Sequence, residues 1–325
     1  MQTHELTRRE VLVSAGALLS GLVMSGARPA MAAAAVSSGA TNSPAAAAGR
    51  ITIGKDMAVN RLGFGAMRVT GDGIWGEPPD VAEAKRVLRL AVELGVDFID
   101  TADAYGPDVS ERLIAEALYP YPKGLVIATK GGLVRPAREK WERDGRPAHL
   151  REACEASLKR LRLERIDLYQ FHAIDPQVPL EESLGEIAKL QKEGKIRHVG
   201  VSNFDVGELE RARKIVPVVS VQNRYNVSDR SSDPVLAVCE RDGLAFIPWS
   251  PLSQSARDSN AGSRAALEAW ALERKVSLPQ AAIAWLLARS PAMLPIPGTS
   301  KAKHLEENVA AAALRITPED MRAIG

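Results

Sequence analysis

For possible chemistry, the most informative stretch of the chain is VDFIDTADAYG, residues 96–106. A short run of β-branched and aromatic residues ends in Asp100, and Tyr105 follows shortly after it. Such a run is typical of a buried strand that delivers polar side chains to a cleft. Asp100 and Tyr105 are therefore candidate site residues.

Two further ionisable residues close later apolar runs: Lys130 ends the run LVIATK, and His172 follows the run IDLYQF. Each residue alone has an ordinary structural explanation, such as a helix cap, half-buried packing or a hydrogen-bonded strand end. Together they have a chemical one, because a buried lysine needs a carboxylate such as Asp100 to stay charged, and its ammonium then favours ionisation of a phenol. With His172 to orient an oxygen, this set is suited to protonating an alkoxide as it forms at a carbonyl.

The elements that would position these residues follow a repeating strand and helix pattern. Eight short apolar runs are predicted strands: 62–67, 96–101, 125–130, 166–171, 196–203, 218–223, 244–250 and 293–298. Amphipathic segments between and after them are predicted helices: 79–95, 110–119, 150–161, 180–194, 206–215, 233–243, 266–275 and 278–290. This alternation indicates a parallel sheet covered by helices, and eight repeats favour an α/β fold of the (β/α)8 TIM barrel type. The competing doubly wound sheet requires GxGxxG after its first strand, and GFGAMR at 63–68 lacks the third glycine.

Residues 1–32 have the features of an export signal and not of a fold element. Arg8 and Arg9 precede an apolar run over residues 11–24, and AMA at 30–32 forms a small-x-small cleavage site. This pattern predicts a signal peptide of the twin-arginine type and export to the periplasm or the cell exterior. Uncleaved membrane tethering is the alternative, and an unused signal would leave the protein in the cytoplasm.

Two short segments separate this signal from the barrel. Residues 33–49 are rich in alanine, serine and glycine and are predicted to be a disordered linker. Residues 51–60 alternate around Gly54 and Asp56, which predicts a short β-hairpin ahead of the barrel. The barrel domain is therefore expected to span residues 50–325.

Charge and cysteine content narrow the partners. Lys and Arg (42) nearly balance Asp and Glu (40), which excludes the strong field expected of a nucleic-acid or anionic-membrane partner. Cys154 and Cys239 have neither CxxC nor Cys/His spacing, so we expect no metal site and two buried free thiols. A small molecule is the expected partner, and the protein is expected to be a monomer or a weak homo-oligomer.

Seven motifs resemble those of the aldo-keto reductase family in order and spacing: DTADAYG, VIATKGG, DLYQFHAID, GKIRHVGVSNF, VSVQNRYN, IPWSPL and IPGTSKAKHLEENVAAA. The resemblance covers the chain from about residue 50 to the end. It implies a (β/α)8 barrel and NAD(P)H-dependent reduction of an aldehyde or ketone, with Asp100, Tyr105, Lys130 and His172 as the catalytic tetrad and Tyr105 as the proton donor. A cofactor-sensing regulatory subunit is one alternative, and a barrel aldolase with Lys130 as a Schiff base is another.

The resemblance also implies a set of cofactor-binding residues: Gly65, Ala66, Met67, Ser202, Asn203, Gln222, Trp249, Ser250, Leu252, Gly298, Thr299, Ser300, Glu307 and Asn308. Trp249 takes the ring-stacking position, which is usually a tyrosine in the family. Free N–H groups at the start of the helix after Ser300 suit a phosphate. Many relatives have an arginine at the His304 position for the 2′-phosphate of NADPH, whereas this chain has Lys301 and Lys303 nearby. We therefore favour NADP(H) over NAD(H) and add Lys301 to the cofactor-binding set.

The substrate pocket is expected opposite the cofactor, between the loops that follow the first and fourth strands. Trp75 and Ile174 are its candidate wall residues, and loop anchoring is an alternative role for Trp75. The loop after the third strand is longer than a usual βα connection, so Arg135 and Trp141 are expected to shape the rim. These residues do not identify the carbonyl substrate.

Overall fold

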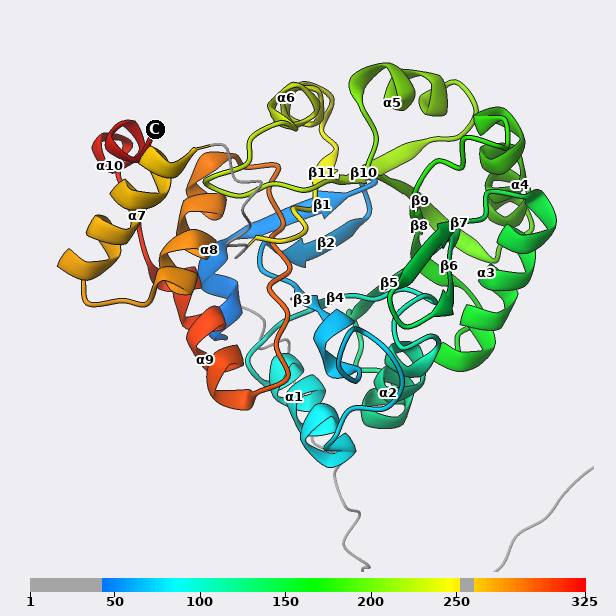
Figure 1. The fold of residues 1–325 in the computed structure, drawn as a ribbon, viewed down its shortest axis with the longest axis horizontal. Coiled ribbons are helices and arrows are strands. Elements are labelled where there is room, and N and C mark those ends of the chain that lie inside the picture. Colours follow the sequence, from blue (N-terminus) through cyan, green and yellow to red (C-terminus); the bar gives the residue numbers. More distant parts are fainter. Residues whose placement is uncertain (1–42, 252–259) are drawn as a thin grey trace, which may run out of the picture. The chain divides into compact units, whose positions relative to one another are not determined.

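The structure is a computed structural model that describes residues 43–251 and 260–325. A curved parallel sheet passes through these residues (Figure 1). Its neighbouring strands follow the chain order: β3 (Phe64–Gly65), β4 (Phe98–Asp100), β5 (Val126–Gly131), β8 (Ile166–Phe171), β9 (Ile196–Ser202), β10 (Val218–Gln222) and β11 (Ala245–Phe246). Every residue of β4 and β5 is buried, as expected where side chains on both faces of a parallel sheet are covered. The first seven predicted strands are thus confirmed.

The predicted eighth strand, 293–298, has no regular strand, yet it occupies the eighth position of the barrel. On one side the Leu294 N–H donates to the Phe246 carbonyl, and on the other the Gly63 N–H donates to the Pro295 carbonyl. The prolines of this segment have no N–H, so a continuous ladder cannot form. The fold is therefore the predicted (β/α)8 barrel, closed by an extended segment in place of the last strand.

The seam where this segment meets β3 requires glycine. A Cβ on Gly65 would lie 2.6 Å from the Ile296 carbonyl oxygen, and a Cβ on Gly298 would lie 2.4 Å from the Gly65 carbonyl oxygen. Real Cβ atoms do not approach so closely, so the two backbones meet only because both side chains are absent. This close approach brings Gly65 and Gly298 to the carboxyl ends of the strands.

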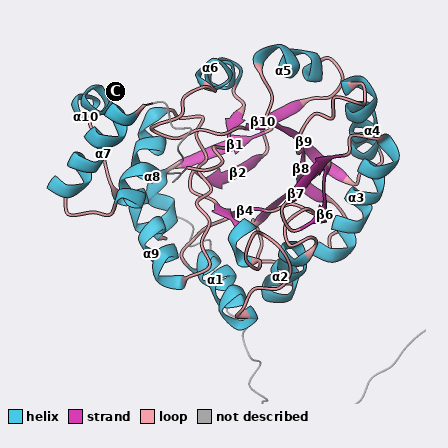
Figure 2. Ribbon diagram, in the orientation of Figure 1, coloured by secondary structure: helices cyan, strands magenta, loops and turns pink. Residues whose placement is uncertain are grey.

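Helices cover the outside of the sheet, as Figure 2 shows. They are α1 (Val81–Glu93), α2 (Val109–Leu118), α3 (Pro147–Leu161), α4 (Leu180–Lys192), α5 (Val206–Arg213), α6 (Asp233–Asp242), α7 (Ala261–Glu273), α8 (Leu278–Arg289), α9 (Ala302–Ala310) and α10 (Pro318–Ile324). The helix caps are as the sequence predicts: Asp80 caps α1 by accepting from the Glu83 N–H, and Gly243 ends α6 with a φ of 68°. Capping boxes at Asp205 and Ser277 begin α5 and α8.

Two hairpins and three short 3-10 helices, Pro44–Ala48, Ala66–Val69 and Ala311–Ala313, complete the described part. The predicted hairpin is confirmed as β1 (Arg50–Ile53) paired with β2 (Met57–Asn60). The long connection after β5, which we expected to be a loop, contains a second hairpin, β6 (Leu133–Ala137) and β7 (Lys140–Arg143).

The predicted linker, 33–49, is not disordered over its whole length. Pro44–Ala48 form a 3-10 helix, in which Ala45 is fully buried and donates its N–H to the Leu94 carbonyl. Small alanine side chains allow this segment to pack closely beside α1, so the composition that suggested a linker also permits packing. The predicted signal peptide lies outside the described residues.

Within residues 43–251 and 260–325, no helix combines the length and apolar character needed to cross a membrane. The same residues contain no group of three or more His, Cys, Asp or Glu side chains placed to hold a metal ion. Cys154 and Cys239 are buried free thiols, as predicted. Burial raises the pKa of each thiol to about 12, which makes both poor nucleophiles.

Candidate active site

A buried ion pair joins the ends of β4 and β5. Lys130 Nζ lies 2.6 Å from Asp100 Oδ2 and donates a second hydrogen bond, of 2.8 Å, to the Thr101 carbonyl. The Lys130 side chain has no exposed surface and that of Asp100 almost none. Burial alone would lower the pKa of Lys130, but the charge of Asp100 opposes this and the pKa is raised above its usual value. The lysine is therefore an ammonium.

The other oxygen of Asp100 is held by two glutamines. Gln170 on β8 and Gln222 on β10 each donate from Nε2 to Asp100 Oδ1, at 2.9 and 2.8 Å. One carboxylate thus receives side-chain hydrogen bonds from three strands, β5, β8 and β10. This network leaves the carboxylate little freedom to turn away from the lysine.

Tyr105 lies on the turn after β4, and its hydroxyl oxygen is 3.4 Å from Lys130 Nζ. The ammonium also lies 5.1 Å from the centre of the phenol ring. Burial raises the pKa of Tyr105 and the Lys130 charge partly opposes that rise. The phenol is therefore protonated near neutral pH and has a cation beside it that stabilises its anion.

His172 follows β8 and presents its ring at 80° to the Tyr105 ring, with the centroids 5.9 Å apart. Burial, together with the Lys130 charge, lowers the pKa of His172 well below its usual value, so the imidazole is neutral. Its Nδ1 is buried without a hydrogen-bond partner in the part of the chain that the structure describes. A neutral imidazole beside a protonated phenol can orient one ligand oxygen.

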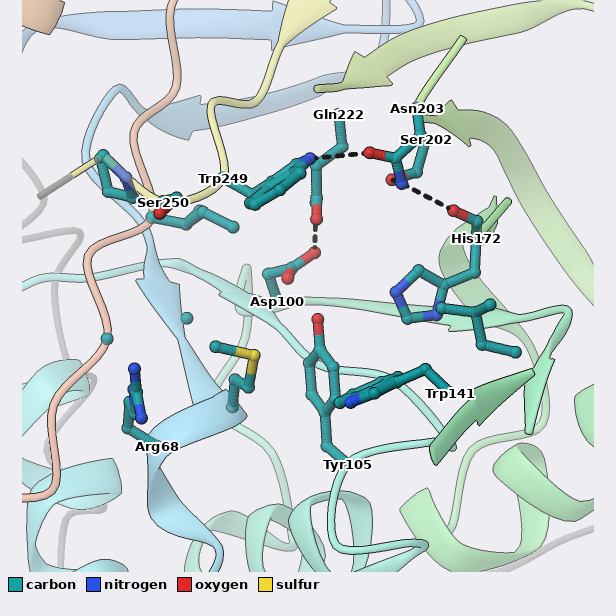
Figure 3. A pocket seen from close by; sticks show the side chains of 16 residues that line it. Arg68, Asp100, Tyr105, Trp141, His172, Ser202, Asn203, Gln222, Trp249 and Ser250 are labelled. Carbon is teal, nitrogen blue, oxygen red and sulfur yellow. Dashed lines mark hydrogen bonds between the residues drawn. The ribbon is translucent and has the colours of Figure 1, made fainter. Parts of the chain in front are cut away.

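These side chains face a cavity of about 800 Å³ (Figure 3). It is lined by Gly65, Met67, Arg68, Asp100, Tyr105, Leu133, Trp141, His172, Ser202, Asn203, Gln222, Trp249, Ser250, Pro251, Ile296 and Gly298. The lining comes from the carboxyl ends of the strands and the loops after them, where the active sites of such barrels lie.

One wall of the cavity joins an indole to side-chain amides. Trp249 Nε1 donates to Asn203 Oδ1 at 2.9 Å, and Asn203 Nδ2 donates to the His172 carbonyl at 3.1 Å (Figure 3). Asn203 has a φ of 62°, a left-handed conformation that asparagine tolerates better than most residues. Ser202 and Gln222 lie beside it in the lining. The indole is therefore fixed relative to His172 through a single side chain.

The other predicted cofactor residues fall into three groups. Gly65, Met67, Ser250 and Gly298 line the cavity, whereas Ala66 is buried beneath it. Thr299, Ser300, Lys301, Glu307 and Asn308 lie outside the lining, on the approach to α9 or within it. Leu252 lies outside the described residues.

The start of α9 differs from the expectation of free N–H groups. The Ala302 N–H donates to Glu83 Oε1 at 3.3 Å, and the Lys301 N–H donates to Thr299 Oγ1 at 3.1 Å. A carboxylate from α1 thus occupies part of the position expected to suit a phosphate. The positive end of the helix dipole attracts this carboxylate for the same reason that it would attract a phosphate.

Of the four residues expected on the substrate side, Trp75, Arg135, Trp141 and Ile174, only Trp141 lines the cavity. Trp141 was expected on the rim and lines the cavity, and Arg135 lies against the Trp141 ring. Trp75 and Ile174 are not among the lining residues. Ile174 instead packs against the main apolar core, because the segment after His172 turns away from the cavity toward α4.

Sequence reasoning missed two polar residues of the site. Arg68 lines the cavity and forms no ion pair with another described residue, and its place directly after Met67 in GFGAMR was the available signal. Gln170 was hidden inside an apolar strand. Gln170 lies two residues after Leu168, and side chains two residues apart in a strand point to the same face. Because Leu168 faces the barrel interior, this spacing could have indicated that Gln170 points toward Asp100.

Comparison with known proteins identifies the family of this chain. The model of the aldo/keto reductase family matches residues 61–325. An uncharacterized oxidoreductase of Schizosaccharomyces pombe is 52% identical over 275 residues, covering 85% of this chain and 88% of that protein. Pyridoxine 4-dehydrogenase of Escherichia coli is 40% identical, covering 80% of this chain and 92% of that protein.

This chain belongs to the aldo/keto reductase family. Among solved structures, an aldo/keto reductase from Klebsiella pneumoniae in complex with NADP and acetate superposes with a TM-score of 0.71. The two are 25% identical, and the match covers 85% of this chain and 93% of that one. The chain is thus an oxidoreductase of this family, whose neighbours bind a nicotinamide cofactor.

The cavity of this aldo/keto reductase fits such a cofactor. The Trp249 indole offers a flat face, and the amides of Asn203 and Gln222 beside it match a ring that carries a carboxamide. Gly65 and Gly298 also line the cavity, and Gly298 is partly exposed there.

A second buried carboxyl group, Asp103, lies just behind the tetrad. Its Oδ1 has no hydrogen-bond partner within the described chain. Burial and the charge of nearby Glu111 raise the pKa of Asp103 well above its usual value. Glu111 in turn accepts from Thr129 Oγ1 and Arg160 Nε, at 2.5 and 2.6 Å. The folded reductase therefore binds the Asp103 proton more tightly than the unfolded chain does.

This difference predicts a pH dependence of stability. The stabilising effect is complete below the unfolded carboxyl pKa of about 3.8 and is lost as pH rises through the raised folded pKa. Asp103→Asn stays neutral, so its free energy of unfolding relative to wild type should be higher at pH 8 than at pH 5. Urea unfolding at both pH values measures this, with exposed Asp72→Asn as the control; an equal difference at both pH values would contradict the assignment.

Proposed function

We propose that this aldo/keto reductase reduces an aldehyde or a ketone to an alcohol with NADP(H). The observation that carries the proposal is the protonated Tyr105 hydroxyl 3.4 Å from the Lys130 ammonium, beside the neutral His172 ring and facing the cavity. These are the groups needed to hold a carbonyl oxygen and to give it a proton.

Ser202, Asn203, Gln222 and Trp249 are the residues that would hold the nicotinamide. When bound, the cofactor supplies a hydride to the carbonyl carbon. Trp249 offers the stacking face, and its hydrogen bond to Asn203 fixes the orientation of that face. Gly65 and Gly298 line the part of the cavity along which the rest of the dinucleotide would pass.

The tetrad residues act on the substrate oxygen. His172 donates a hydrogen bond to this oxygen and positions it next to the Tyr105 hydroxyl. Tyr105 transfers its proton as negative charge develops, and Lys130 stabilises the phenolate that remains. Asp100 keeps Lys130 charged throughout, at 2.6 Å. All four groups are oriented before the substrate arrives, so the transition state requires little reorganisation.

The same geometry disfavours a Schiff-base aldolase. A nucleophilic lysine needs a depressed pKa, whereas the pKa of Lys130 is raised and its ammonium is fully engaged by Asp100, Thr101 and Tyr105. The complete tetrad likewise gives no reason to prefer a regulatory subunit that turns over slowly.

Replacing the proton donor tests the reaction. Tyr105→Phe should lower kcat for a reactive aldehyde by about 100-fold to 10,000-fold, the contribution of a general acid, while NADPH still binds. NADPH consumption and quenching of protein fluorescence by NADPH measure the two effects. Tyr119→Phe, at a half-exposed tyrosine on the outer surface, is the control. Unchanged turnover in Tyr105→Phe would contradict the assignment.

The preference for NADP(H) rests on the lysines before and within α9, together with the NADP bound to the Klebsiella pneumoniae reductase. Lys301 and Lys303 are exposed, and a 2′-phosphate near them would form charge-assisted hydrogen bonds. The double variant Lys301→Ala/Lys303→Ala should lower kcat/KM for NADPH by about tenfold and leave that for NADH nearly unchanged. Exposed Lys214→Ala is the control, and an equal loss with both cofactors would count against the preference.

The relatives also guide the choice of substrates. Because one of them is a pyridoxine 4-dehydrogenase, pyridoxine and the aldehyde formed by its oxidation at carbon 4 belong in the test panel with simple aldehydes. We propose the interconversion of an alcohol and a carbonyl compound as the reaction class. The direction that the reaction takes in the cell is to be determined from its measured equilibrium.

We further propose export by the twin-arginine route, supported by Arg8, Arg9 and the apolar run over 11–24. Export of a folded chain would allow the cofactor to be bound before transport. Cell fractionation tests the proposal: a shortened protein outside the cytoplasm is the expected result, and replacement of both arginines by lysine should retain the full-length chain in the cytosol. Full-length wild-type protein confined to the cytosol would refute it.

A further inference from the structure

Arg135, on β6, is a buried guanidinium without a carboxylate partner in the described part of the chain. It is only 7% exposed. Its donors are satisfied entirely by backbone carbonyls: those of Ile74 at 2.9 Å, Gly73 at 3.1 Å and Lys140 at 3.1 Å, and that of Arg138. Burial lowers the pKa of Arg135, and the charge of exposed Glu139 opposes this only in part, so the placement requires other compensation.

Two indole rings provide it. The Arg135 guanidinium carbon lies 3.9 Å from the centre of the Trp141 ring and 5.5 Å from that of Trp75. Planar guanidinium groups interact favourably with aromatic faces, and indole is the best partner among the side chains. Arg135 thus contacts two tryptophans from different segments, Trp75 in the loop after β3 and Trp141 in β7.

The loops that Arg135 joins are far apart in sequence. Gly73 and Ile74 both have left-handed backbone, with φ of 68° and 57°, so their carbonyls point away from any regular ladder and are free to accept from Arg135. The other two acceptors, Arg138 and Lys140, belong to the hairpin beside the cavity, where Lys140 begins β7. Arg135 therefore ties the loop after β3 to the hairpin after β5.

Trp141 is the member of this assembly that reaches the site. It lines the cavity, its side chain is 40% exposed, and its ring meets the Tyr105 ring at 74° with centroids 6.5 Å apart (Figure 3). An exposed indole next to the proton donor leaves apolar aromatic surface uncovered unless a ligand covers it. Since Arg135 already occupies one of its faces, the indole cannot rotate away without losing that contact.

The geometry points to Trp141 as the wall that selects planar aromatic or heteroaromatic aldehydes, and to Arg135 as the residue that positions it. This inference rests on the proposed carbonyl reduction. A flat ring stacked on Trp141 would place its aldehyde group beside Tyr105 and His172. An aliphatic aldehyde of similar size reaches the same oxygen position without the stacking energy.

The test compares two substrates in each variant. Trp141→Leu should lower the ratio of kcat/KM for benzaldehyde to kcat/KM for butanal by about tenfold, mainly through KM, whereas Trp141→Phe keeps most of the ratio. Arg135→Leu should shift the ratio in the same direction by a smaller factor. Arg135→Lys should fail to restore it, because an ammonium cannot make the forked set of carbonyl contacts.

Arg315→Leu is the matched control, since Arg315 also donates only to backbone carbonyls, those of Ala47, Ala312 and Leu314, far from the cavity. Its substrate ratio should equal that of wild type. An unchanged ratio in Trp141→Leu would overturn the inference, whether or not the Arg135 variants fold. Failure of the wild-type protein to reduce either aldehyde would instead overturn the proposed function.

Discussion

The buried ion pair between Lys130 and Asp100 is the interaction on which the site depends. An ammonium without exposed surface requires a compensating anion, and removal of either partner would leave an uncompensated charge in the barrel interior. Gln170 and Gln222 satisfy the second oxygen of the carboxylate, so the pair also links side chains from β4, β5, β8 and β10. The strands of the barrel place Lys130 and Asp100 next to each other. Because neither charge is stable in the interior without the other, the interior must keep this arrangement.

Burial determines the protonation states around this pair, and the Lys130 charge adjusts them. The positive charge of Lys130 disfavours a second cation and thereby helps to keep His172 neutral, while it reduces the increase that burial causes in the pKa of Tyr105. The site therefore presents a protonated phenol and a neutral imidazole near neutral pH. A protonated phenol and a neutral imidazole can both donate a hydrogen bond to a carbonyl oxygen. Burial and charges within the barrel produce both protonation states.

The tetrad was predictable from sequence because parallel strands bring their carboxyl ends to one side. Asp100, Lys130 and His172 each close an apolar run, and that regularity alone places them together. Features that depend on exceptions to the pattern were not predictable. The eighth segment looks like a strand in composition but is broken by prolines, and the hairpin after β5 carries mostly charged and aromatic residues that resemble a loop. The position of Ile174 depends on the direction of a turn, which periodicity does not encode.

The deep part of the site and its rim are built by different means, and this has a functional consequence. The tetrad is held by side-chain hydrogen bonds that Asp100 accepts from β5, β8 and β10, so it cannot vary without disturbing the barrel. Trp141 is held by Arg135 through carbonyls of two loops and by ring contacts, which can change without altering the sheet. A substitution in the hairpin can therefore change which carbonyl compound is accepted while the proton transfer at Tyr105 remains the same.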